Sequence, residues 1–250
     1  MFMQLFGVIN ASPDSLHPES IARTPAEAAR RAEWLLAEGC FGFDIGGQGS
    51  THAAAETSVD EEWARLEPLI ETLVGYDVPI SVDTWRPETA RRALESGVTW
   101  LNAADGLQND DMIELAAAWN CPVVLPFLSG PDPLRMERVT DHDPVDVLIG
   151  FFNNMIARTD AAGITDNLVI DPGTGFAPHD WPWEERYAYQ KQVYGQLERL
   201  RVYGRPLYIA LPWKETEQHA ELLEIVIDNR PDYGRCHHPD RIRAAERARS

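Results

Sequence analysis

The sequence has few lysines and no excess of positive charge. Lys191 and Lys214 are the only lysines among 22 basic residues, which stand against 40 acidic residues and leave a formal net charge of −18. A surface that neutralises phosphates needs clustered Lys and Arg, so we expect neither nucleic acid nor an anionic membrane as a partner. In so lysine-poor a chain, a lysine close to a candidate site is of particular interest.

Cysteines and long apolar runs are also scarce. Cys40, Cys121 and Cys236 are widely spaced, which fits neither a disulfide framework nor a zinc cluster. No apolar run reaches the roughly 18 residues of a membrane span. The first residues, MFMQLFGVIN, lack the basic segment and cleavage site of a signal peptide and are typical of a strand. We therefore expect a cytoplasmic protein.

What the chain does have is a regular alternation of short apolar strands and amphipathic helices. This alternation is typical of βαβ units and a parallel sheet. The predicted strands are QLFGVI from Gln4, FGFDIG from Phe41, PISVD from Pro79, TWLNA from Thr99, PVVLPF from Pro122, NLVID from Asn167, PLYIAL from Pro206 and YGRCH from Tyr233. Helix openings are predicted at Thr24-Pro25 and at Pro87, Pro144 and Pro239, because Pro is favoured at the first helical position.

Eight such units predict a (β/α)8 TIM barrel of the α/β class, with residues 1–250 as one domain. Eight strands close a barrel, and roughly 250 residues is its typical length, whereas an open doubly wound sheet usually has five or six strands. The longest irregular stretches are residues 11–23, 46–58 and 129–143. All three follow strands, so we expect them on the catalytic face of the barrel.

Polar residues end most of these strands, where a packed core would exclude them. They are Asn10, Asp44, Asp83, Asn102, Asp171, Lys214, Arg235 and His237. A single Asp after a strand is more often a helix N-cap than a catalytic group. A whole ring of such residues is hard to explain as caps, since buried charge is costly unless it is paired or used. The ring predicts an active site at the carboxyl ends of the strands, where barrels place them.

The two signs of charge come from different strands. The carboxylates and amides follow the second, third, fourth and sixth strands, and the cations come from the seventh and eighth, where barrels often bind phosphate. We therefore predict a ligand with hydrogen-bond donors at one end and a phosphate or diphosphate at the other. The loop Asp171-Pro-Gly-Thr-Gly-Phe176 lets the backbone approach a ligand closely, and Phe176 is predicted to stack on a flat ring.

These motifs resemble those of dihydropteroate synthase and the wider pterin-binding barrel group, which includes corrinoid-linked methyltransferases. GVINASPDS from Gly7 and DIGGQGST from Asp44 look like the first two signatures of the family. SVDT, LNAADGL, VIDPGTGF, the Lys214 position and R-x-H at Arg235 follow in the family's order. The resemblance covers nearly the whole chain and rests on seven motifs in sequence.

The resemblance implies a transferase that condenses a 6-hydroxymethyl-7,8-dihydropterin diphosphate with an arylamine such as p-aminobenzoate and releases diphosphate. Catalysis would consist mainly of leaving-group stabilisation and positioning. The residues implied to hold the pterin are Asp83, Asn102 and Asp171, with Asp44, Thr51 and Phe176 as further substrate-binding residues. Lys214 would contact the pterin carbonyl region.

At the other end, Arg235 and His237 would hold the diphosphate, and Asn10 would support a Mg²⁺ ion on it. Asp83, Lys214, Arg235 and His237 are thus the predicted catalytic residues. The resemblance also suggests a homodimer, and it names two small molecules, a pterin diphosphate and an amine, as partners.

The chain departs from the family pattern where the family forms its p-aminobenzoate pocket. It has Leu16-His17-Pro18 in place of Phe and a Ser-Asp-Gly stretch, His52-Ala53-Ala54 in place of Arg-Pro-Gly, and Pro212-Trp213 in place of Ser-Arg. The acceptor amine is therefore predicted to differ. Two alternatives remain open: a pterin- or folate-binding methyltransferase subunit, against which the Arg235 and His237 pair speaks, and a non-catalytic pterin-binding paralogue.

Overall fold

Eight parallel strands form one sheet in the order β6-β5-β4-β3-β2-β1-β8-β7 in the computed structural model, which describes residues 2–13, 17–49, 54–139 and 143–249. The strands are β1 Gln4–Asn10, β2 Gly42–Gly46, β3 Ile80–Thr84, β4 Trp100–Ala103, β5 Val123–Pro126, β6 Leu168–Asp171, β7 Tyr208–Ala210 and β8 Tyr233–Cys236. Each predicted strand is found at its expected place.

The two ends of this sheet meet, so the sheet closes on itself. A parallel bridge joins Ile170 of β6 to Leu207, just before β7, and the Ile170 amide donates to the Pro206 carbonyl oxygen at 3.0 Å. The neighbouring strands are all paired in parallel. The prediction of a (β/α)8 barrel is confirmed.

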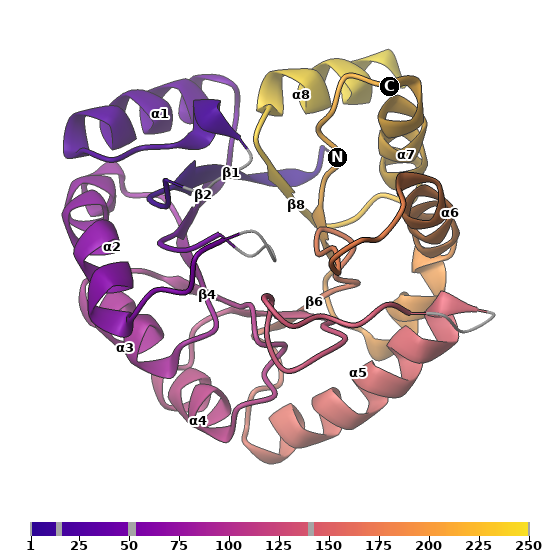
Figure 1. Cartoon of the computed structure of the whole chain (residues 1–250), viewed down its shortest axis with the longest axis horizontal. Helices are drawn as coiled ribbons and strands as arrows, with labels where there is room; N and C mark the ends of the chain where they lie inside the picture. The colour runs from indigo at the N-terminus through magenta and orange to yellow at the C-terminus, as the bar shows by residue number, and fades with distance from the viewer. Residues whose placement is uncertain (1, 14–16, 50–53, 140–142, 250) are drawn as a thin grey trace.

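A ring of helices surrounds the strands (Figure 1). The α-helices are α1 Pro25–Ala37, α2 Val59–Leu73, α3 Pro87–Glu95, α4 Asp110–Trp119, α5 Pro144–Ala161, α6 Trp183–Tyr194, α7 Glu217–Asp228 and α8 Pro239–Ala248. Among the described residues, three 3-10 segments accompany them: η1 Pro18–Ser20, η2 Val74–Tyr76 and η3 Leu197–Tyr203. The predicted openings at Pro25, Pro87, Pro144 and Pro239 are confirmed, and the Thr24 hydroxyl accepts from the Glu27 amide at 3.3 Å as an N-cap.

The inside of the barrel is filled by large side chains. Phe6, Trp100, Val124, Val169 and Tyr208 form an apolar cluster there, separate from the larger core between strands and helices. The Phe6 ring lies 5.0 Å from Trp100 and 5.8 Å from Tyr208, measured between centroids. Burying each of these side chains contributes about 1.5–3 kcal/mol. The cluster, which we call the aromatic floor, carries the polar layer described below.

The three longest loops follow β1, β2 and β5, as predicted, so they lie on the face at the carboxyl ends of the strands. At the chain ends, the Met3 amide donates to Glu246 of α8 at 2.9 Å, and both termini lie on the α7–α8 side of the barrel (Figure 1). Among the described residues, no helix has the length and apolar character needed to cross a membrane.

Candidate active site

The predicted polar residues of β2, β3, β4, β6 and β8 come together above the aromatic floor. Strand register explains why: Asp83 pairs with Asn102 across β3 and β4 and with Gly46 across β2 and β3. Because strand side chains alternate between faces, residues two apart point the same way. Hydrogen bonds and charges bring Asp44, Asp83, Asn102, Asp171 and Arg235 together near the carboxyl ends of their strands, and we call these five residues the acidic ring.

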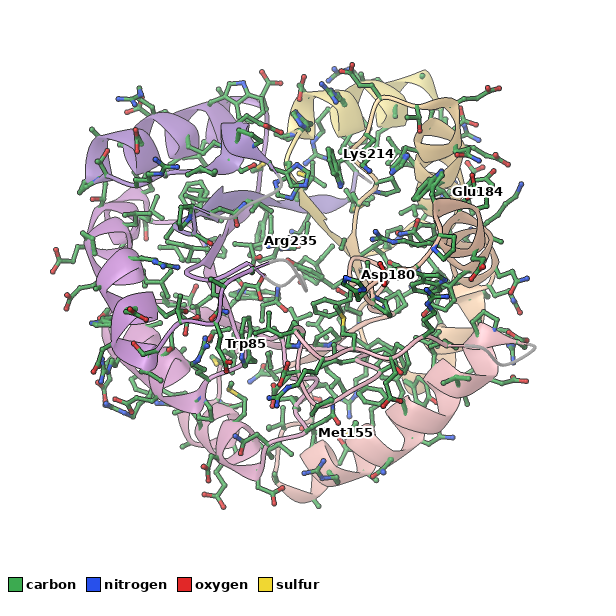
Figure 2. The ribbon with its side chains drawn as sticks, in the orientation of Figure 1. Trp85, Met155, Asp180, Glu184, Lys214 and Arg235 are labelled. Atoms are coloured by element: carbon green, nitrogen blue, oxygen red, sulfur yellow. The ribbon has the colours of Figure 1, made fainter. Side chains whose placement is uncertain are left out.

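Arg235 lies inside the acidic ring and bridges two of its carboxylates. Its Nε donates to Asp44 Oδ2, and its Nη2 donates to Asp83 Oδ2 at 3.0 Å. Figure 2 places Arg235 near the centre of the barrel. The sequence predicts carboxylates at one end of the site and cations at the other, but the structure does not separate the signs in this way. The β1–β8 and β2–β3 pairings put Arg235 between two carboxylates.

Asp44 is fully buried, and both of its oxygens have partners. Oδ2 accepts from Arg235, and Oδ1 accepts from the Asn102 amide nitrogen at 3.5 Å. The Asp44 carboxylate therefore orients the side chains of Arg235 and Asn102.

The acidic ring holds more negative than positive groups, and this excess affects the pKa values of its carboxyl groups. Three carboxylates share one guanidinium in a site shielded from water. Burial raises the pKa of Asp83 to about 7, although Arg235 opposes the rise. Burial likewise raises the pKa of Asp171 to about 7. Although burial disfavours the charge of Arg235, the Asp44 and Asp83 carboxylates raise its pKa above the usual value. The ring can therefore gain or lose a proton near neutral pH.

Asp171 is fixed by the glycine loop that follows it. Its Oδ1 accepts from the Gly173 amide at 2.8 Å. Gly173 has a φ of +70°, and a Cβ added there would lie 2.0 Å from the Phe127 carbonyl oxygen, so only glycine fits. The loop thereby holds the Asp171 carboxylate in the ring.

The floor of the site carries one polar atom of its own. The Tyr208 hydroxyl is buried and has no hydrogen-bond partner among the described residues. Burial raises the pKa of Tyr208 far above its usual value, and Asp44 adds to the rise. Sequence reasoning missed Tyr208, because a tyrosine within an apolar strand is normally a core residue.

His237 follows β8 and is held by a set of contacts beside the ring. Its Nδ1 hydrogen-bonds to Ser20 Oγ at 2.7 Å, and Arg31 of α1 donates to the His237 carbonyl oxygen at 2.6 Å. Its ring stacks on His17 with centroids 3.4 Å apart and 10° between planes. Burial and Arg235 lower the pKa of His237 well below the usual value, and burial lowers the pKa of His17 to about 4. Both imidazoles are neutral at pH 7.

The remaining predicted residues lie away from the ring or outside the described residues. Lys214 is exposed on the loop before α7, with its Nζ 5.3 Å from the Trp213 ring, and Figure 2 places it toward α7 and α8. Phe176 lines a small hollow with Trp181 and Tyr189. Asn10 ends β1, half-buried. Thr51 lies outside the described residues, as do Leu16 and His52.

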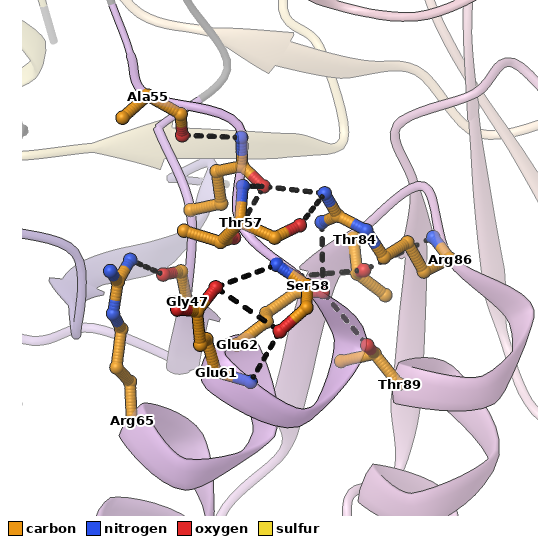
Figure 3. A network of polar contacts seen from close by, with 11 residues as sticks. Gly47, Ala55, Thr57, Ser58, Glu61, Glu62, Arg65, Thr84, Arg86 and Thr89 are labelled. Carbon is orange, nitrogen blue, oxygen red and sulfur yellow. Dashed lines mark hydrogen bonds and ion pairs between the residues drawn. The ribbon is translucent and has the colours of Figure 1, made fainter.

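A second partly buried arginine, Arg86, holds the β2–α2 loop, and sequence reasoning missed it. Arg86 donates to Glu62 at 3.0 Å, to Gln48 at 2.7 Å and to the Thr57 carbonyl oxygen at 2.7 Å (Figure 3). Glu62 is fully buried and also accepts from the hydroxyls of Thr84 and Thr89 at 3.0 and 2.8 Å. We call these residues the Arg86 network. It ties the loop that carries the DIGGQGST motif to β3 and α3.

Comparison with known proteins bears on what this arrangement does. The profile of a family described as pterin binding enzyme matches residues 6–210. The chain belongs to this family. It is 29% identical over 213 residues to the dihydropteroate synthase of Escherichia coli K12, covering 84% of this chain and 73% of that protein.

Solved structures agree with the family assignment. The Yersinia pestis dihydropteroate synthase, in a complex with a sulfonamide drug, has a TM-score of 0.87 at 26% identity over 98% of this chain and 92% of that one. The Thermus thermophilus enzyme, in complex with 4-aminobenzoate, has a TM-score of 0.80 at 27% identity over 98% and 93%. This pterin binding enzyme is therefore a transferase of the dihydropteroate synthase type. The comparisons favour that function over a methyltransferase subunit or a non-catalytic paralogue.

Proposed function

We propose that this pterin binding enzyme joins 6-hydroxymethyl-7,8-dihydropterin diphosphate to an amine acceptor. The bond between the pterin methylene carbon and the diphosphate oxygen breaks, a carbon–nitrogen bond to the amine forms, and the amine loses a proton. The acidic ring is the observation that carries this proposal. Its acceptor atoms lie at the mouth of the barrel above an apolar floor, which suits a flat ring with hydrogen-bond donors along one edge.

The pterin ring is held by Asp83, Asn102 and Asp171 in this proposal. A pyrimidinone with an amino group offers several N–H donors on one edge, and carboxylate or amide oxygens accept them. Because burial raises the pKa of Asp83 and of Asp171 to about 7, a ligand that donates hydrogen bonds there stabilises their charged forms. The ring therefore favours ligands with donors over ligands with acceptors.

The diphosphate end is formed by Arg235 and His237, while Lys214 would contact the pterin carbonyl region. His237 stays neutral at pH 7 because burial lowers its pKa, so it acts on an anion as an N–H donor. Arg235 supplies the positive charge from within the acidic ring, where it is paired with Asp44 and Asp83. Charge development on the leaving diphosphate is what such fixed donors stabilise.

Mg²⁺ fits Asn10 in its donor chemistry. Asn10 ends β1 at the catalytic face and offers an amide oxygen, and Mg²⁺ is usually held by one or two protein oxygens together with substrate phosphates. When bound, the ion would neutralise charge on the diphosphate. The residues of this chain would bind the pterin, orient its methylene group and exclude water from it.

The acceptor site differs from the usual one, in our proposal, at Leu16, His52 and Pro212. Pro212 lines a cavity of about 290 Å³ beside Trp213 and Lys214. The Thermus thermophilus relative binds 4-aminobenzoate, and we expect this chain to accept an arylamine whose substituent is read by different contacts.

A diphosphate-release assay tests the proposed reaction. The full chain is incubated with the pterin diphosphate, Mg²⁺ and a panel of arylamines that includes p-aminobenzoate, and the condensed product is identified by mass spectrometry. We expect amine-dependent release that is lost in Asp83→Ala and kept in Arg91→Ala, a substitution on the outer face of α3. Absence of a condensed product with every amine would refute the proposal.

Three further features belong to the same proposal. The family resemblance supports a homodimer, which analytical ultracentrifugation would test. Three buried free cysteines, Cys40, Cys121 and Cys236, suit a reducing cytoplasm. That residues 1–250 act as one domain stays a prediction, testable by limited proteolysis.

A further inference from the structure

One group of side chains outside the acidic ring has the spacing of a metal site. Within the part of the chain that the structure describes, His17, Glu19 and His238 place one ligand atom each within 4.8 Å of one another. His17 Nδ1 lies 3.6 Å from Glu19 Oε1, and His238 Nε2 lies 2.9 Å from the same oxygen. The three residues come from the loop before α1 and the turn before α8, which only the closed barrel brings together.

The positions of the two histidines are fixed by their surroundings. His17 is buried between the rings of His237, at 3.4 Å, and Trp213, at 3.8 Å between centroids. His238 is the N-cap residue of α8 and its side chain makes no capping hydrogen bond. Glu19 is 41% exposed on its side chain, so an ion has a path to the group from solvent.

The chemistry of these ligands selects a particular class of ion. Zinc lies about 2.0–2.2 Å from imidazole nitrogen and carboxylate oxygen, which puts tetrahedral ligand atoms about 3.4 Å apart. The observed 2.9 and 3.6 Å bracket that separation. Imidazole suits zinc, cobalt, nickel and copper, whereas Mg²⁺ prefers oxygen ligands.

We propose that His17, Glu19 and His238 bind a divalent transition-metal ion such as Zn²⁺. Three protein ligands leave a further coordination position for water or a substrate oxygen. The ion ties the β1–α1 loop to the β8–α8 turn beside His237. Asn10 is not among these ligands, so this site is separate from the Mg²⁺ site proposed above.

The test measures metal binding without any pterin, so its outcome is independent of the transferase proposal. Tag-free full-length protein is stripped with a chelator and titrated with Zn²⁺ by calorimetry, and with Co²⁺ by visible absorption. We expect one metal ion to bind per chain and to raise the thermal unfolding midpoint. Bound Co²⁺ should show the stronger visible absorption bands of a low-symmetry site. Excess Mg²⁺ should not displace the ion.

Ligand variants and matched controls decide whether these residues carry the binding. Glu19→Gln and His238→Ala should each weaken Zn²⁺ binding at least about tenfold, since even outer-shell changes typically cost that much. His179→Ala and Glu185→Gln, at exposed positions elsewhere, should leave it unchanged. Circular dichroism before titration establishes that every variant is folded. Equal Zn²⁺ affinity in the ligand variants, no binding by the parent chain, or displacement by Mg²⁺ would each overturn the proposal.

Discussion

Two partly buried arginines of this barrel have opposite surroundings. Arg86 donates to one carboxylate, that of fully buried Glu62, which also accepts hydrogen bonds from two threonine hydroxyls. Arg235 meets two carboxylates and lies near a third, that of Asp171. Charges balance in the Arg86 network and do not balance in the acidic ring. Unbalanced buried charge is costly, so we infer that the ring is built for a ligand and the network for the fold.

The largest effect is expected from Arg235→Met. Diphosphate release should fall about 10²–10³-fold, because a fixed donor to the leaving group is lost. Stability should fall less than in the Glu62 variant below, since the freed carboxylates can take up protons instead of staying charged. Kinetics and urea unfolding on the same preparation measure both. A variant with parental activity would remove Arg235 from the site.

Glu62→Ala should show the opposite balance, a large loss of unfolding free energy with a smaller loss of activity. Removing this carboxylate leaves the partly buried Arg86 without its charge partner, and breaking such a pair costs about 3–5 kcal/mol of unfolding free energy. Glu67→Ala, on the exposed part of the same helix, is the control and should change stability by no more than about 0.5 kcal/mol. Equal urea midpoints for the two variants would contradict the structural role of the network.

Asp171→Asn should alter how stability depends on pH. Burial raises the pKa of Asp171 to about 7, above the value of about 3.9 in an unfolded chain. The folded state therefore binds more protons than the unfolded state between these values, and its stability falls as pH rises toward 7. Between pH 5 and 7.5 the titration of this group should lower the unfolding free energy by about 2–3 kcal/mol.

Urea unfolding of the Asp171→Asn variant and the parent across that range isolates the contribution. Carboxylates with lowered pKa values titrate below the range, and the buried groups that do titrate within it, such as Asp83, are common to both proteins. Parallel curves for the two proteins would show that Asp171 is charged throughout.

Thr89→Val should have the smallest effect. It removes one of the donors to Glu62 at 2.8 Å while keeping the shape of the side chain, and such a hydrogen bond contributes about 1 kcal/mol. Denaturant unfolding measures the loss, and activity should be unchanged. A loss as large as that of Glu62→Ala would mean that packing, rather than this hydrogen bond, stabilises the network.

Local patterns predicted much of the architecture. Apolar segments bounded by Pro and Gly located all eight strands, and the proline openings of α1, α3, α5 and α8 were read from single residues. Those features depend on neighbours in the sequence. The residues at strand ends followed from the same reasoning, because a barrel brings all carboxyl ends to one face.

Which of those residues contact one another could not be predicted from local sequence patterns. Arg235 and Asp83 are 152 positions apart, and only the register of β8, β1, β2 and β3 places one beside the other. The separate ends that the sequence suggested for the two signs were therefore not found. Arg86 and Glu62 were missed for a similar reason, since each looks like an ordinary charged residue at the start of a helix.

The central claim is that the acidic ring, and not the balanced network, binds the pterin. Calorimetry with 6-hydroxymethyl-7,8-dihydropterin diphosphate and Mg²⁺ tests it most directly, on the parent chain, Asp171→Asn and Thr89→Val. We predict binding by the parent and by Thr89→Val, and at least about tenfold weaker binding by Asp171→Asn, the equivalent of about 1.4 kcal/mol. Equal affinities for the parent and Asp171→Asn would contradict the account.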